Sequence, residues 1–262
     1  MLNKILLLNP ILQAFIAGLF TYSITALGAA LVFFMKKINK TFLDGMLGFS
    51  AGIMIAASFF SLILPSINMA EELKLIPWLI VLIGFISGGL LLFIGDKIYN
   101  LLYSNKTEGL KRCTMLMTSI TLHNIPEGMA IGVAFGSVIY GLTGSTLISA
   151  WIIALGIGLQ NFPEGTAVSM PLRREGLSRK KAFFFGQLSG LVEPISAVIG
   201  ALLVMKIRIL LPLLLSFAAG AMIYVVIEEL IPESQTNKNK NLMAIFTILG
   251  FSLMMVLDIS LG

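Results

Sequence analysis

The chain contains one cysteine, one histidine and few charged residues. The single cysteine, Cys113, excludes an internal disulfide. Charged residues make up 12% of the chain, about half of the roughly 25% that is usual in soluble domains. Hydrophobic residues make up 57%, and the mean hydropathy is +0.96. This composition indicates a membrane protein.

Apolar runs of about 20 residues, each long enough to cross roughly 30 Å of hydrocarbon as a helix, recur along the chain. We therefore predict an all-α polytopic fold in which residues 1–262 form a single transmembrane transporter domain. Lys4 precedes an apolar stretch without a cleavage site, so we assign this segment to the first span. The eight predicted spans cover about 10–35, 45–68, 77–99, 114–139, 146–171, 182–205, 208–231 and 241–261.

The basic residues are distributed unevenly between the two sets of alternate loops. Fourteen of the 18 fall in one set, which holds Lys36, Lys37, Lys40, Lys97, Lys106, Lys111, Arg112, Arg173, Arg174, Arg179, Lys180, Lys181, Lys238 and Lys240. Since loops rich in Lys and Arg stay in the cytoplasm, we expect both termini outside it, in the plasma membrane. The net charge of +5 then reflects topology and does not indicate nucleic-acid binding.

Two nearly identical polar segments interrupt the apolar sequence. The first is His123-Asn124-Ile125-Pro126-Glu127-Gly128, and the second, 37 residues later, is Gln160-Asn161-Phe162-Pro163-Glu164-Gly165. No Lys or Arg lies between Cys113 and Leu172, and Glu193 is the only charged residue from 182 to 205. Carboxylates at membrane depth are costly unless they are protonated or bind a cation. We therefore interpret the two motifs as part of a substrate or ion path.

The spacing within each motif suits metal binding. His123 and Glu127 are four residues apart and share one helix face, while Asn124 lies on the neighbouring stripe. Pro126 and Pro163 each remove a backbone hydrogen bond and loosen the helix beside the polar residues. The motifs lie at depths that differ by only about 3 Å when counted from the turn at 140–145. Mixed nitrogen and oxygen ligands favour Zn²⁺ and its first-row neighbours.

These segments, together with Gly190-Leu191-Val192-Glu193-Pro194, resemble the fourth, fifth and sixth helices of the ZIP (Zrt/Irt-like) divalent metal transporters, most closely the bacterial GufA-like branch. The resemblance covers essentially the whole chain. It implies a binuclear metal centre, with His123, Glu127, Gln160 and Glu164 in one site. In the second site, Asn124, Asn161 and Glu193 join the shared carboxylates.

An internal repeat supports this architecture. Residues 51–55 (AGIMI) match residues 219–223 (AGAMI) at an offset of 168, and Ser66 matches Ser234 at the same offset. The two copies lie in predicted spans two and seven, which gives them inverted topology. The resemblance implies an inverted 3+2+3 arrangement. It also implies that Met54 approaches the outer side of the centre and that Glu228 and Glu229 receive metal toward the cytoplasm.

The motifs depart from many relatives in the family. Gln160 stands where many have His, and Asn161 stands where some have an acid, which leaves the metal preference open. We expect transport of divalent metal ions toward the cytoplasm, with Zn²⁺ as the main substrate and Fe²⁺, Mn²⁺ and Cd²⁺ as alternative ions. We expect no prosthetic group and no nucleic-acid partner. The expected partners are the metal ion and the lipid bilayer, and a homodimer is left open.

Two other classes of protein fit parts of the pattern. A proton- or sodium-coupled symporter of a small organic solute could use the same buried carboxylates, but the sequence shows no solute-selective group. An intramembrane metalloprotease would need more than one His, and the chain has no His-Glu-x-x-His motif. We therefore expect a transporter and not an enzyme.

Overall fold

The computed structural model describes residues 9–34, 39–102, 108–141, 145–174 and 176–261, apart from some helical side chains, among them those of Asp96, His123 and Arg174. These residues form helices and no strand. The first three membrane-length segments are α2 (Pro10–Phe34), α3–η1–α4 (Lys40–Ala57, Ser58–Ile63 and Leu64–Glu72) and α5 (Pro77–Leu102). Two long helices follow, α6 (Glu108–Ser137) and α7 (Leu147–Arg174), with the short η2 (Val138–Tyr140) after α6.

The last three segments match the first three in number. They are α8–η3–α9 (Arg179–Leu188, Ser189–Leu191 and Val192–Lys206), η4–α10–η5–α11 (Arg208–Leu210, Leu211–Val225, Val226–Leu230 and Ile231–Ser234) and α12 (Lys240–Leu261). Within the described part of the chain, six stretches are long and apolar enough to cross a membrane. They are Pro10–Phe34, Lys40–Glu72, Pro77–Gly95, Arg179–Lys206, Leu211–Ser234 and Lys240–Ser260. The all-α polytopic membrane fold is therefore confirmed.

Helices α6 and α7 cover the two remaining predicted spans. They fall outside the six apolar stretches, and each carries one of the polar motifs near its middle. Both helices continue through their internal prolines, Pro126 in α6 and Pro163 and Pro171 in α7.

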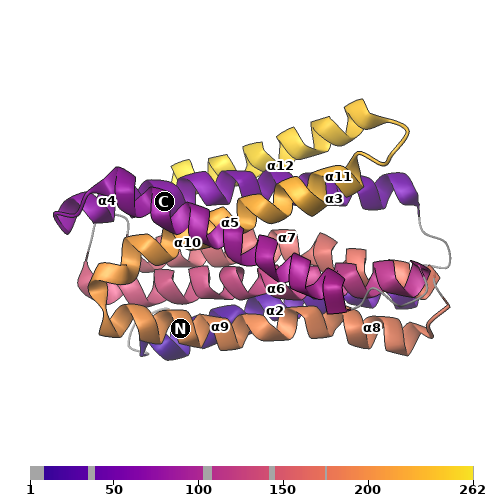
Figure 1. Ribbon diagram of the computed structural model, residues 1–262, viewed down its shortest axis with the longest axis horizontal. Helices are drawn as coiled ribbons and strands as arrows, with labels where there is room; N and C mark the ends of the chain where they lie inside the picture. Colours follow the sequence, from indigo (N-terminus) through magenta and orange to yellow (C-terminus); the bar gives the residue numbers. More distant parts are fainter. Residues whose placement is uncertain (1–8, 35–38, 103–107, 142–144, 175, 262) are drawn as a thin grey trace.

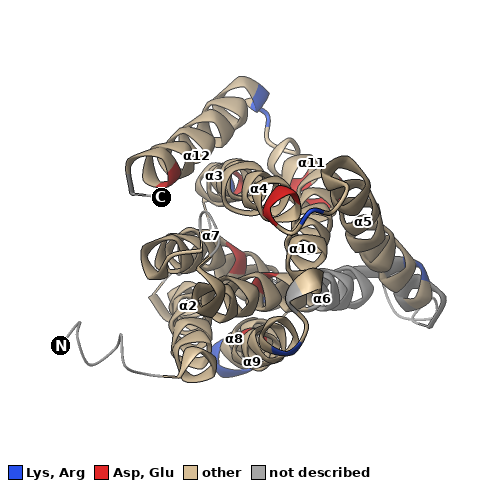
Figure 2. Cartoon of the chain, turned by 90° about the vertical axis from the view of Figure 1, so that its left-hand side faces the viewer, with Lys and Arg blue, Asp and Glu red and all other residues tan. Residues whose placement is uncertain are grey.

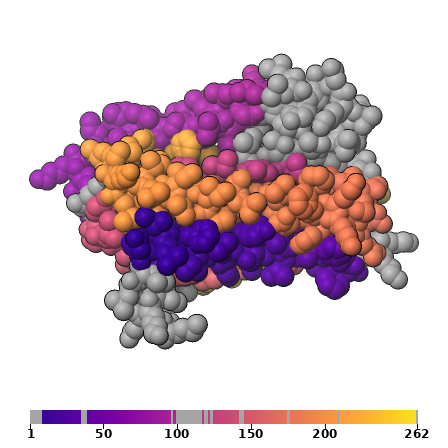
Figure 3. All heavy atoms as spheres, turned by 90° about the horizontal axis from the view of Figure 1, so that it is seen from below, coloured from indigo at the N-terminus to yellow at the C-terminus, as the bar shows by residue number. Residues whose placement is uncertain are grey.

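The helices pack as two groups. In the first, α2 packs against α7, and α6 packs against α9. In the second, α5 packs against α10, and α12 packs against α3. The groups meet where α3 lies on α7 and α10 lies on α6. Seen along the helices, acidic segments lie between α7 and α6 (Figure 2). On another face, α2 runs beside α8 and α9 (Figure 3).

The internal repeat recurs in the structure at the same offset of 168 residues. The π-helical segment η1 begins at Ser58, and the π-helical segment η5 begins at Val226. The Ser66 hydroxyl donates to the carbonyl oxygen of Pro212 at 2.6 Å. Its counterpart Ser234 donates to the carbonyl oxygen of Asp44 at 2.8 Å, and Asp44 is itself the counterpart of Pro212. The first three and last three segments are therefore related both in sequence and in hydrogen bonding.

Each of the two π-helical segments is followed by a proline. Pro65 follows η1 by two residues, and Pro232 follows η5 by two residues. Each proline lacks an N–H for the preceding turn, and its ring crowds that turn. A wider π turn accommodates the ring without ending the helix.

The start of α2 and the end of α12 lie at one end of the molecule (Figure 1). The end of α2 and the start of α3, the end of α7 and the start of α8, and the described connection from α11 to α12 lie at the opposite end. These are connections for which the sequence predicts a cytoplasmic location. Because the start of α2 and the end of α12 lie together at the other end, this arrangement agrees with an even number of membrane crossings.

Candidate metal centre

Helices α6 and α7 carry the two motifs, and α9 carries the third acidic position. The described motif side chains and Glu193 are fully buried: Asn124, Glu127, Gln160, Asn161, Glu164 and Glu193 each have 0% of their surface exposed. The side chain of His123, which is predicted to be a ligand, lies outside the described residues. No Lys or Arg is among the buried side chains of the described residues.

The three carboxylates lie in one buried region. Glu127 accepts a hydrogen bond from Gln160 and Glu193 accepts one from Asn161, and both amides lie about one helical turn before Glu164 on α7. Like charges gathered in a buried site repel one another unless protons or a cation neutralise them. The packing of α6, α7 and α9 thus places three carboxylates where protons or a bound cation are needed to neutralise them.

Hydrogen bonds link four of the polar side chains in two pairs. The Gln160 amide nitrogen donates to Glu127 Oε1, which links α7 to α6. The Asn161 amide nitrogen donates to Glu193 Oε2 at 2.8 Å, which links α7 to α9. The first pair belongs to one of the two ligand sets expected from the family resemblance, and the second pair belongs to the other.

The asparagines of the two motifs are held in equivalent ways. Asn124 donates to the carbonyl oxygen of Ser189 at 2.9 Å, and Asn161 donates to the carbonyl oxygen of Thr21 at 3.4 Å. Thr21 and Ser189 are 168 residues apart, so these two bonds follow the repeat. Each bond fixes the direction of the amide and therefore the direction of its oxygen.

Three buried amide oxygens accept no hydrogen bond from the described residues. They are Asn124 Oδ1, Gln160 Oε1 and Asn161 Oδ1. A buried acceptor without a donor costs about 1–3 kcal/mol, so three in one region are unusual. Metal ions take amide oxygens as ligands. The donor set therefore fits a cation bound by oxygen atoms.

Among the described side chains, no group of three Asp, Glu, His or Cys residues could hold a metal ion by itself. That search does not include His123. A metal centre at this position therefore depends on the amide oxygens as well as on the carboxylates.

The glycines that end the motifs bring neighbouring backbones close to the polar residues. A Cβ atom on Gly128 would clash with the carbonyl oxygen of Glu193, and one on Gly165 would clash with the carbonyl oxygen of Thr25. Thr25 and Glu193 are counterparts in the repeat. Glycine thus permits α9 and α2 to pack directly against the two motif helices.

The three transport-path residues implied by the resemblance lie on spans two and seven. Met54 is fully buried on α3, one turn from Ser50. Glu228 and Glu229 lie in the π-helical segment η5, where Glu228 is exposed and Glu229 is partly buried. Glu229 is the repeat counterpart of Ser61 in η1. Their roles remain predictions.

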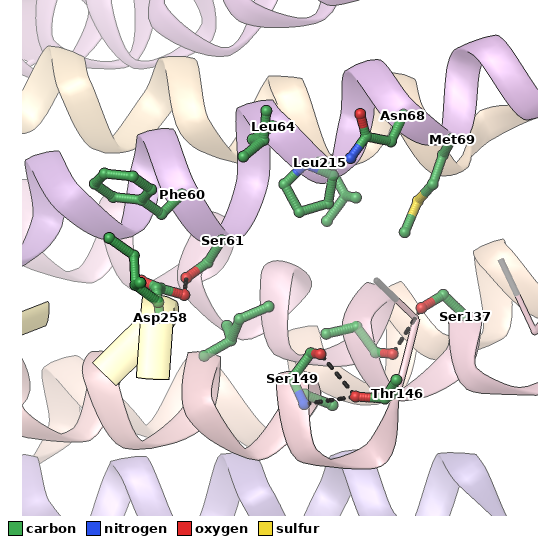
Figure 4. A pocket seen from close by; sticks show the side chains of 15 residues that line it. Phe60, Ser61, Leu64, Asn68, Met69, Ser137, Thr146, Ser149, Leu215 and Asp258 are labelled. Atoms are coloured by element: carbon green, nitrogen blue, oxygen red, sulfur yellow. Dashed lines mark hydrogen bonds between the residues drawn. The ribbon is translucent and has the colours of Figure 1, made fainter. Parts of the chain in front are cut away.

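A cavity of about 350 Å³ lies at the end of the molecule where α2 starts and α12 ends. Most of its lining is apolar, and its polar lining residues are Ser61, Asn68, Ser137, Thr146, Ser149 and Asp258 (Figure 4). The Ser61 hydroxyl donates to Asp258 Oδ1 at 2.6 Å. We call this cavity the vestibule.

The vestibule ends about two helical turns from both motifs. Ala134 in its wall lies seven residues after Glu127, and Ile153 lies seven residues before Gln160. Seven residues of helix span about 10 Å. Buried side chains, among them Met54 and Ile157, occupy the corresponding turns of α3 and α7.

Two hydroxyl groups near the motifs were not predicted from the sequence. Thr25 on α2 donates to Glu193 Oε1 at 3.3 Å, and Ser50 on α3 donates to Glu164 Oε1 at 3.2 Å. Each lies more than 100 residues from its partner. Thr25 lies 168 residues before Glu193, so it is the repeat counterpart of Glu193. Subtracting the repeat offset from Glu193 would therefore have identified Thr25 from the sequence.

Comparisons with known proteins identify the family of this chain. Residues 106–258 match the family described as "ZIP Zinc transporter". Zinc transporter ZIP11 of Bos taurus is 37% identical and aligns over 97% of this chain and 98% of its own length. Zinc transporter ZIPB of Bordetella bronchiseptica is 36% identical over 95% of this chain and 81% of its own. Zinc transporter GufA of Myxococcus xanthus is 33% identical over 94% and 98%.

The matched family region contains both motifs and Glu193. The relatives extend the match over nearly the whole chain. They are named as transporters and not as enzymes, which agrees with the sequence-based expectation. The chain belongs to the ZIP zinc transporter family.

Proposed function

We propose that this protein carries Zn²⁺ across the membrane toward the cytoplasm by alternating access through a centre on α6, α7 and α9. The observation that carries this proposal is the set of three buried amide oxygens without donors among the described residues, beside three buried carboxylates. The relatives are named zinc transporters. Oxygen and imidazole ligands also accept Fe²⁺, Mn²⁺ and Cd²⁺, which we propose as alternative substrates.

The centre would hold two metal ions. His123, Glu127, Gln160 and Glu164 would form the first site. Asn124, Asn161 and Glu193 would form the second together with the shared carboxylates. The separation of the hydrogen bonds into a Gln160–Glu127 pair and an Asn161–Glu193 pair supports this division.

The path would run from the vestibule past Met54 to the centre, and then to Glu228 and Glu229. The excess of basic residues in the opposite loops supports placing the vestibule outside the cytoplasm. The repeat relation between Ser61 in the vestibule and Glu229 in η5 supports treating these residues as the two ends of one path. The buried turns between vestibule and centre would be the outer gate.

The test is Zn²⁺ uptake into proteoliposomes by the full chain and by the variants Glu127→Ala and Glu164→Ala. We expect each variant to insert normally and to lose uptake, because each removes a carboxylate that both sites share. Glu71→Ala, on the exposed end of α4, is the matched control and should transport normally. Full uptake by either motif variant would reject the proposed centre. Binding of an organic solute by the metal-free protein would favour solute symport instead.

A further inference from the structure

One side chain of the second helix group contacts a motif carboxylate. Ser50 lies on α3 and is fully buried. Its hydroxyl oxygen lies 3.2 Å from Glu164 Oε1 and 3.3 Å from the carbonyl oxygen of Gln160. Both partners belong to α7, in the first helix group. The hydroxyl therefore reaches the candidate metal centre across the boundary between the two groups.

These distances match those between ligands of one metal ion. Two oxygen atoms bound to the same Zn²⁺ at about 2.1 Å each lie roughly 3.0–3.5 Å apart. A serine hydroxyl has two lone pairs and one proton. When Glu164 binds a cation, the hydroxyl can turn its proton toward the Gln160 carbonyl and present a lone pair to the ion.

The repeat indicates that packing does not require this hydroxyl. The counterpart of Ser50 at an offset of 168 residues is Ala218 on α10, which is also fully buried. The same fold thus accommodates an alanine at the equivalent place in the other repeat. The hydroxyl at position 50 adds a polar group to a position where a methyl group packs equally well.

We propose that Ser50 coordinates the metal ion held by Glu164, so that the second helix group supplies one ligand to the transported ion. This proposal rests on the proposed function. A ligand from the opposite group is present only while the two groups hold this relative position. Ser50 therefore strengthens binding in the arrangement that this structure shows, and its bond to the ion must break before the groups move.

Coordination by Ser50 predicts that its substitution changes the half-saturation concentration and the maximal rate of transport differently. Ser50→Ala should raise the half-saturation concentration for Zn²⁺ about tenfold, within the range seen when a partner of a metal ligand is removed. The maximal rate should stay the same or rise, because the step that frees the ion becomes easier. A packing defect would instead lower the maximal rate together with the amount of folded protein.

A cysteine at the same position gives a direct signature. In a Cys113→Ser background, Ser50→Cys places a soft sulfur ligand beside Glu164, and Cd²⁺ should then be preferred over Zn²⁺ at least tenfold more than in the parent. Bound Cd²⁺ should also show thiolate-to-metal absorption in the ultraviolet. The matched control is Ser66→Cys on the same span. Ser66 is also fully buried, but its hydroxyl contacts the Pro212 carbonyl.

The measurements are equilibrium Zn²⁺ and Cd²⁺ binding and proteoliposome uptake by the purified full chain. The Cd²⁺ signature in Ser50→Cys and its absence in Ser66→Cys support the proposal. Unchanged Zn²⁺ half-saturation in Ser50→Ala, with no cadmium–thiolate band in Ser50→Cys, overturns it while the parent still binds metal. A parent protein that binds no metal would reject the proposed function itself.

Discussion

At the residue scale, the two motifs differ most at the position that holds His123 in α6 and Gln160 in α7. The Gln160 amide is neutral, and its nitrogen is engaged with Glu127. Imidazole is a better donor to Zn²⁺ than an amide oxygen. In the proposed centre, Gln160 would thus be the weaker ligand of a site that must also release its ion.

Gln160→His should therefore lower the Zn²⁺ half-saturation concentration by a few-fold. The maximal rate should stay constant or fall, because a path with several sites conducts only if each site releases its ion. Uptake kinetics in proteoliposomes measure both quantities. An unaltered half-saturation concentration in a folded variant would show that Gln160 does not contact the metal.

The buried carboxylates also predict a pH dependence. Glu127, Glu164 and Glu193 must be deprotonated to bind metal, so Zn²⁺ binding releases protons and weakens as the solution becomes more acidic. We expect the apparent affinity to fall between about pH 8 and about pH 5. Calorimetry in buffers with different ionisation enthalpies counts the released protons. An affinity that is constant over this range would contradict carboxylate ligation.

At the element scale, close helix packing depends on where glycine occurs. A Cβ atom on Gly88 of α5 would clash with the carbonyl oxygen of Phe217 on α10, whereas one on Gly89 would lie 3.6 Å from the nearest atom, the carbonyl oxygen of Gly220. The two adjacent glycines thus differ in how closely the backbone of α10 approaches them. Only the first is required for the contact between α5 and α10.

Gly88→Ala should destabilise the protein by about 1–3 kcal/mol, because the two backbones must separate. Gly89→Ala is the matched control and should leave stability unchanged or improve it, since alanine favours helix more than glycine does. Thermal unfolding in detergent compares the two variants with the parent. Equal losses in the two variants would contradict the view that the close approach of α10 at Gly88 distinguishes this pair.

The π-helical segments η1 and η5 are a second feature of this scale. They lie on spans two and seven at equivalent places of the repeat, and η5 carries Glu228 and Glu229. Apolar periodicity cannot distinguish a π turn from an α turn over so short a stretch. Pro65 and Pro232 were visible in the sequence, but the turn that accommodates them depends on how each helix packs.

At the scale of the whole molecule, the uneven basic loops predict an orientation that labelling can test. Lys206 and Lys238 are both exposed and lie at opposite ends of the predicted topology. In a Cys113→Ser background, a membrane-impermeant maleimide should label Lys206→Cys in intact cells. It should label Lys238→Cys only after the membrane is opened. The reverse pattern would place both termini in the cytoplasm and reverse the proposed direction.

The sequence by itself determined the all-α membrane fold, the repeat and the residue types of the proposed centre. Spans follow from apolar length, which depends on neighbouring residues and on the thickness of the bilayer. Glu127, Glu164 and Glu193 were identifiable because unpaired acids in apolar sequence are costly wherever the helices pack. The family could be predicted for the same reason, since its motifs are local in the chain.

Only the tertiary structure decided which groups surround those residues. Ser50 reaches Glu164 from a position 114 residues away, and Ser61 reaches Asp258 across 197 residues. The vestibule likewise combines residues from spans two, four, five, seven and eight. Such contacts depend on the rotation and spacing of packed helices. Most apolar faces in a membrane protein look alike in sequence, because lipid and protein neighbours both accept them.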